Sequence, residues 1–139
     1  ENVSFALDYD LYVIRALAVR YSDPGMFDTQ LGTSQLLEGT WTSGFVALAL
    51  GHDNRYRGLN KLASAARQRW DRYLSTLVPL NRARLSVPYE AIRQRALYRA
   101  AQRLSPPLRG MLAKRLGISL KALSTPPPQI AFPTPRGSR

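Results

Sequence analysis

Eight apolar side chains between positions 59 and 77 recur at helical spacing, and this run constrains the fold more than any other feature of the chain. At 100° per residue they fall within about 60° of one line along a helix. They are Leu59, Leu62, Ala63, Ala66, Trp70, Tyr73, Leu74 and Leu77. Pro79 then ends the run, because proline disrupts a helix interior. The pattern predicts an amphipathic helix with one buried face.

The N-terminal segment allows two interpretations. Residues 8–21 favour a helix that is capped by Asp8 and ended by Asp23-Pro24-Gly25. Apolar residues also alternate over residues 4–13, which would suit a strand. The alanine-rich continuation of the segment favours the helix.

Glycines interrupt the next apolar stretch at positions 32, 39, 44 and 51. Each glycine costs a helix interior about 1 kcal/mol relative to alanine. We therefore expect two short helices here, over residues 34–39 and 42–50, followed by a turn over residues 51–54.

Beyond the amphipathic run, proline and glycine mark the boundaries. A linker over residues 80–87 leads to a helix that Pro88 opens and that reaches about Leu104. Residues 105–107 break this helix. A short helix over residues 108–116 then stops at Gly117, and a single turn follows over residues 119–123.

Residues 111–124 resemble the core of a helix-turn-helix, with a helix ending at Gly117, Ile118-Ser119 as the turn and a basic second helix. Pro126, Pro127 and Pro128 limit that second helix to about one turn, which is too short to place several side chains on base edges. We therefore expect contact with phosphates rather than sequence-specific reading of the major groove.

Together these elements predict a mostly α-helical fold, a small helical bundle of about five or six helices. Residues 1–124 would form one helical domain, with an acidic and apolar part over residues 1–50 and a basic part over residues 51–124. Residues 125–139 would form a Pro-rich extended tail. In this tail, Ile130 and Phe132 are the apolar residues expected to dock on a partner or on the chain's own domain.

Charge divides the chain unevenly. The first fifty residues carry two basic and six acidic residues, a net charge of −4, whereas the remaining eighty-nine carry eighteen basic and three acidic residues, a net charge of +15. A block of one sign attracts polyanions, and this attraction weakens with salt. The asymmetry predicts a nucleic-acid partner.

The basic side chains fall on the polar faces of the predicted helices and in their connections. On the amphipathic helix, Arg57, Lys61 and Arg72 lie opposite the apolar stripe. The full set of residues predicted to contact nucleic acid is Arg55, Arg57, Lys61, Arg72, Arg82, Arg84, Arg95, Arg99, Arg103, Lys114, Arg115 and Lys121. Arg93 falls inside an apolar arc, and we expect it to pair with Glu90 one turn earlier.

Catalytic chemistry has little support in the sequence. His52 is the only histidine and lacks a nucleophile motif to serve, so a turn-stabilising pair with Asp53 is the expected role. Asp8 and Asp10 would converge only on a strand. We therefore expect no enzyme activity, no metal site and no cofactor.

The sequence thus predicts a non-catalytic subunit of a ribonucleoprotein or DNA-processing assembly that holds the backbone of RNA or single-stranded DNA. The alternative is an assembly subunit whose basic face meets an acidic protein or an anionic membrane surface. The longest apolar run, residues 45–50, is too short to span a bilayer. The chain lacks cysteine, which is compatible with the cytoplasm or an organelle matrix and leaves the localisation open.

Overall fold

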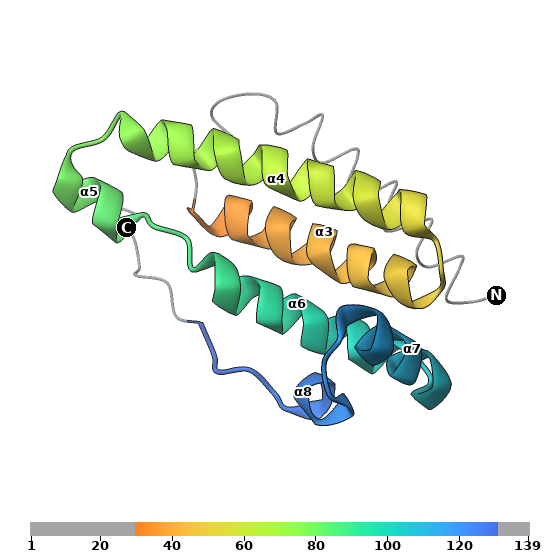
Figure 1. Cartoon of the computed structure of the whole chain (residues 1–139). Helices are drawn as coiled ribbons and strands as arrows, with labels where there is room; N and C mark the ends of the chain where they lie inside the picture. Colours follow the sequence, from red (N-terminus) through yellow and green to blue (C-terminus); the bar gives the residue numbers. More distant parts are fainter. Residues whose placement is uncertain (1–29, 131–139) are drawn as a thin grey trace.

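The computed structural model describes residues 30–130, and this part of the chain is mostly helical and contains no β-strand (Figure 1). Its helices are α3 (Gln30–Ala49), α4 (Asp53–Ser75), α5 (Pro79–Arg84), α6 (Tyr89–Arg103), α7 (Pro106–Leu116) and α8 (Leu120–Ser124). The predicted helical class is confirmed. The segment over residues 8–21, with its strand alternative, lies outside the described residues.

Helix α3 lies between α4 and α6 and packs against both (Figure 1). It is one continuous helix, so the prediction of two short helices over residues 34–39 and 42–50 was wrong. Leu37, Phe45 and Val46 are buried on this helix. Fully burying a large apolar side chain contributes about 1.5–3 kcal/mol, which outweighs the cost of each glycine.

Several hydroxyl groups are also buried on α3. Thr40 Oγ1 donates a hydrogen bond to the carbonyl of Leu36 at 2.7 Å, and Thr42 Oγ1 donates to the carbonyl of Glu38 at 2.7 Å. A buried hydroxyl without a partner would cost about 1–3 kcal/mol. Bonding to the preceding turn therefore lets small polar residues occupy the interior of the fold.

Helix α4 confirms the prediction from the apolar stripe. Leu59, Ala63, Ala66, Trp70 and Leu74 are buried on one side of it. The helix begins at Asp53, directly after the turn in which Gly51 adopts a φ of 78°, a left-handed conformation that glycine tolerates best.

Helix α5 occupies most of the expected linker over residues 80–87, so the sequence analysis missed a short helix there. Pro79 stands at the start of this helix, where its fixed φ suits a first turn. The connection that follows is tied to α4 because Trp70 Nε1 donates a hydrogen bond to the carbonyl of Leu85 at 3.2 Å.

Helices α6, α7 and α8 follow the predicted order. Helix α7 begins at Pro106, so the prolines open this helix as well as ending the previous one. Gly117 closes α7 with a φ of 68°, and the Ile118 amide donates to the Ala113 carbonyl at 3.0 Å. Ser119 Oγ accepts a hydrogen bond from the Ala122 amide at 3.2 Å and so caps α8, which is five residues long.

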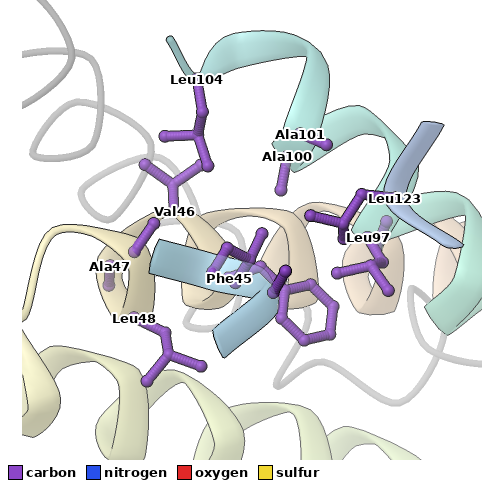
Figure 2. Packing of buried hydrophobic residues seen from close by; sticks show 13 residues of the cluster. Phe45, Val46, Ala47, Leu48, Leu97, Ala100, Ala101, Leu104 and Leu123 are labelled. Atoms are coloured by element: carbon purple, nitrogen blue, oxygen red, sulfur yellow. The ribbon is translucent and has the colours of Figure 1, made fainter. Parts of the chain in front are cut away.

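Two groups of buried side chains hold these helices together. The α3/α6 cluster joins the C-terminal half of α3 to α6, α7 and α8, and Figure 2 shows Phe45 of α3 beside Leu97 of α6 and Leu123 of α8. It includes Phe45, Leu97, Leu104, Leu112 and Leu123. The α3/α4 cluster joins the N-terminal half of α3 to α4 and to the start of α6. It includes Leu36, Leu37, Leu59, Trp70 and Ile92.

The described part of the Pro-rich segment, residues 125–130, is not helical. It leaves α8, and Ile130 reaches the α3/α4 cluster, where this side chain is partly buried. Ile130, which was expected to dock on a partner or on the chain's own domain, therefore packs on its own domain. This contact removes apolar surface of Ile130 from water. Phe132 lies outside the described residues.

Candidate nucleic-acid interface

The outer side of α4 carries a row of exposed polar residues opposite the buried stripe. We call this row the α4 basic face, and it consists of Arg57, Lys61, Ser64, Gln68 and Arg72. From Arg57 to Arg72 the row is about 22 Å long at 1.5 Å per residue. Because α4 is packed along its length against α3, the row lies on a fixed support.

The charges of this face are largely available to a ligand. Within residues 30–130, the side chains of Lys61 and Arg72 have no hydrogen-bond or ion-pair partner, and Arg57 Nη2 donates to Asn54 Oδ1 at 2.5 Å. The acids of α4 are engaged elsewhere, since Tyr89 Oη donates to Asp71 and Arg115 pairs with Asp53. Within residues 30–130, the α4 basic face therefore presents positive charge that no acidic side chain neutralises.

Two arginines of α6 have a different role. Arg99 Nε lies 2.9 Å from a carboxylate oxygen of Glu38, and Arg95 Nη1 lies 3.6 Å from the other oxygen. The Glu38 side chain is only 15% exposed, so it needs compensation for lost hydration. Arg95 and Arg99 therefore pair with an acid from α3, and their contact with nucleic acid stays a prediction.

Arg115 is also engaged within the chain. Its Nη1 lies 3.1 Å from Asp53 Oδ1 and links α7 to the start of α4. The expected pair between His52 and Asp53 does not form, and the His52 amide instead donates to the Ala47 carbonyl at 2.9 Å. Backbone hydrogen bonding stabilises this turn.

Other arginines satisfy carbonyl groups at helix ends. Arg82 donates from Nε to the Leu74 carbonyl at 3.3 Å and from Nη2 to the Leu77 carbonyl at 3.1 Å. Arg109 Nε donates to the Ala101 carbonyl at 2.8 Å. The last carbonyls of a helix lack partners within the helix, and a cation near them is also favoured by the helix dipole. Arg82 therefore stabilises the end of α4, and its contact with nucleic acid stays a prediction.

Arg93 does not form the predicted pair with Glu90. Its guanidinium lies over the ring of Phe45, 5.1 Å from the ring centre. A cation above an aromatic face is attracted to the electron density of the ring. This contact lets a charged residue lie beside the apolar arc of α6 without the acid that the sequence suggested.

Tyr89 connects α4 to the start of α6. Its hydroxyl donates to Asp71 Oδ1 at 2.5 Å, and the Arg67 guanidinium lies over its ring, 4.1 Å from the centre. Burial raises the pKa of Tyr89 well above its usual value of 10, and the hydrogen bond to the Asp71 carboxylate raises this pKa further. The ring is therefore held within the fold.

The remaining predicted contacts are dispersed. Arg55 and Arg103 each have an interaction within the chain. Arg84 on α5, Lys114 on α7 and Lys121 on α8 are exposed, and their side chains are without partners in the described part of the chain. The structure thus gathers only Arg57, Lys61 and Arg72 of the predicted set into one continuous row.

Glu38 is the residue that the sequence analysis missed. It is the only charged side chain in the twenty residues of α3, a helix otherwise made of apolar, small and neutral polar residues. An isolated charge in such a segment requires a partner from elsewhere in the fold. The isolated charge of Glu38 was therefore visible in the sequence, but the sequence alone could not show which arginines would pair with it.

Residues 30–130 contain no group of three or more acidic or histidine side chains placed to bind a metal ion. Among the helices of this region, none is both long enough and apolar enough to cross a membrane. No protein-family model matches the chain, and no significant similarity to a curated protein or a solved structure was found.

Proposed function

We propose that this protein binds the sugar-phosphate backbone of RNA or single-stranded DNA through the α4 basic face. The observation that carries the proposal is the exposed row of Arg57, Lys61 and Arg72 on a helix that is fixed by its buried side. Guanidinium and ammonium groups bind phosphate oxygens through charge-assisted hydrogen bonds. Arg57 and Lys61 lie about 6 Å apart along the helix axis, which is close to the spacing of successive phosphates, and Arg72 lies about 16 Å further along and would meet a more distant phosphate.

Recognition in this proposal is directed at phosphates and not at base edges. Helix α8, the second helix of the segment that resembles a helix-turn-helix, is five residues long and presents Lys121 as its one basic residue. Base reading in the major groove uses several side chains from one helix. Membership of a ribonucleoprotein or DNA-processing assembly stays a prediction.

Salt dependence tests this proposal. Each phosphate contact on a single strand changes the slope of log affinity against log salt by about −0.7, so three contacts predict a slope of about −2. The measurement is fluorescence anisotropy with two labelled RNA oligonucleotides of unrelated sequence. We expect equal slopes and affinities that agree within about threefold, since phosphates carry no sequence information. Absence of binding at about 50 mM salt, or an affinity independent of salt, would contradict the proposal.

A further inference from the structure

The turn that joins α4 to α5 exposes two large aliphatic side chains at one end of the helical array (Figure 1). Val78 is 61% exposed and Leu80 is 70% exposed. They are separated only by Pro79, which is also exposed. A single exposed leucine needs no explanation in a soluble protein, but two neighbouring aliphatic residues form a local apolar tip. We call Val78, Pro79 and Leu80 the apolar tip.

Hydrogen bonds hold the apolar tip in place. Arg82 donates from its side chain to the carbonyls of Leu74 and Leu77 at the end of α4, at 3.3 and 3.1 Å. The Arg82 amide also donates to the Val78 carbonyl at 2.9 Å. Helix α5 itself buries none of its residues. Its formation therefore adds little to the core, while Arg82 fixes a turn that directs the apolar tip away from the core.

The stretch of sequence that contains the apolar tip is basic. Between Asp71 and Glu90 the chain has no acidic residue and three arginines. The Arg82 side chain is hydrogen-bonded to the Leu74 carbonyl near the end of α4. Arg72 and Arg84 are exposed, and their side chains lack partners within residues 30–130. Within residues 30–130, the end of α4 and the start of α5 thus combine two exposed aliphatic side chains with two guanidinium groups that lack partners there.

We propose that the apolar tip inserts into the surface of an anionic lipid bilayer, with Arg72 and Arg84 beside the lipid headgroups. Peripheral binding of this kind combines shallow apolar insertion with attraction between basic residues and acidic lipids. A lipid surface adapts to a protruding turn. A stable protein interface instead buries about 800 Å² per partner and is commonly anchored by aromatic residues, neither of which the apolar tip provides.

This inference goes beyond binding of a nucleic-acid backbone, and its test leaves the arginines unchanged. The full-length protein is sedimented with vesicles of phosphatidylcholine, with and without about 30% phosphatidylserine. The variant carries Val78→Ser and Leu80→Ser, which remove apolar surface without changing the net charge. The matched control carries Met111→Ser and Leu120→Ser, because these side chains on α7 and α8 are 42% and 56% exposed.

We expect the wild-type protein to bind only the vesicles that contain phosphatidylserine. The Val78→Ser, Leu80→Ser variant should bind at least about tenfold more weakly, and the control within about twofold of wild type. RNA affinity should be the same for all three proteins, so failure of this inference is separable from failure of the proposed function. Thermal unfolding establishes that each variant is folded.

Two results would overturn the inference. One is absence of wild-type binding to anionic vesicles, or equal binding by the tip variant, which would show adsorption by charge alone. The other is binding to a soluble acidic polypeptide, polyglutamate, that depends on Val78 and Leu80 while vesicles are not bound. That outcome would assign the apolar tip to an acidic protein partner instead.

Discussion

At the scale of single residues, the partner of each arginine decides its role. Arg99 and Arg95 share Glu38, Arg82 binds carbonyls at the end of α4, and Arg93 covers the ring of Phe45. Each of these contacts depends on groups from another segment of the chain. A count of charge along the sequence treats all the arginines alike and does not show which of them already have partners within the chain.

Tyr89 provides a prediction about pH at the same scale. Burial and the Asp71 carboxylate raise the pKa of Tyr89, so the folded state keeps its proton at a pH where the unfolded state, with a pKa near 10, loses it. The raised pKa of Tyr89 stabilises the folded state by its full amount below about pH 10. This stabilisation is lost as the pH rises from about 10 toward the pKa of Tyr89 in the folded state. Wild-type stability should therefore fall above pH 10.

The Tyr89→Phe variant isolates this contribution. At pH 8 we expect the variant to be less stable than wild type by about 1 kcal/mol, because it lacks the hydrogen bond to Asp71. Above pH 10 this difference should shrink by up to about 1.4 kcal/mol per pH unit, since phenylalanine does not ionise. Urea unfolding of both proteins from pH 8 to 11 measures it. Stability curves that stay parallel would contradict the described environment of Tyr89.

At the scale of elements, the apolar stripe of α4 and the start and end signals of α6 to α8 were sufficient to predict those helices. The glycine-containing α3 was not predictable as one helix, because its continuity depends on burial between α4 and α6. The α4 basic face was identified from spacing alone. The roles of Arg82, Arg95 and Arg115 required knowledge of which distant atoms approach them.

The continuity of α3 gives a testable consequence for its glycines. A Cβ atom added at Gly39 would have no atom within 4 Å outside the helix's own backbone and its chain neighbours. We therefore expect Gly39→Ala to raise the free energy of unfolding by about 0.5–1 kcal/mol, because alanine loses less backbone entropy in a helix. Urea unfolding at pH 7 measures the change.

Gly117→Ala is the matched control for that measurement. Gly117 also has open space around it, but its φ of 68° is unfavourable for alanine. This control should lower the free energy of unfolding by about 1 kcal/mol. A destabilised Gly39→Ala protein would mean that α3 is not one regular helix over Gln30–Ala49.

At the scale of the whole fold described, over residues 30–130, the basic residues divide into a structural set and an available set. The structural set joins α3 to α6 and α7 to α4, as the pairs of Glu38 and Asp53 show. The available set includes the α4 basic face, together with Arg84, Lys114 and Lys121 on three other helices. The central claim is that the position of the α4 basic face, and not the net charge of the chain, governs binding of nucleic acid.

Two variants of equal charge test this claim most directly. One replaces Arg57, Lys61 and Arg72 with glutamine, and the other replaces Arg84, Lys114 and Lys121, which are likewise exposed. Neither set should change stability by more than about 1 kcal/mol, since exposed charges contribute little. The measurement is the affinity of each folded variant for one labelled single-stranded RNA at fixed salt. We predict a loss of at least about tenfold for the α4 variant and less than about threefold for the other. Equal losses would contradict a localised site and show that net charge alone attracts the RNA.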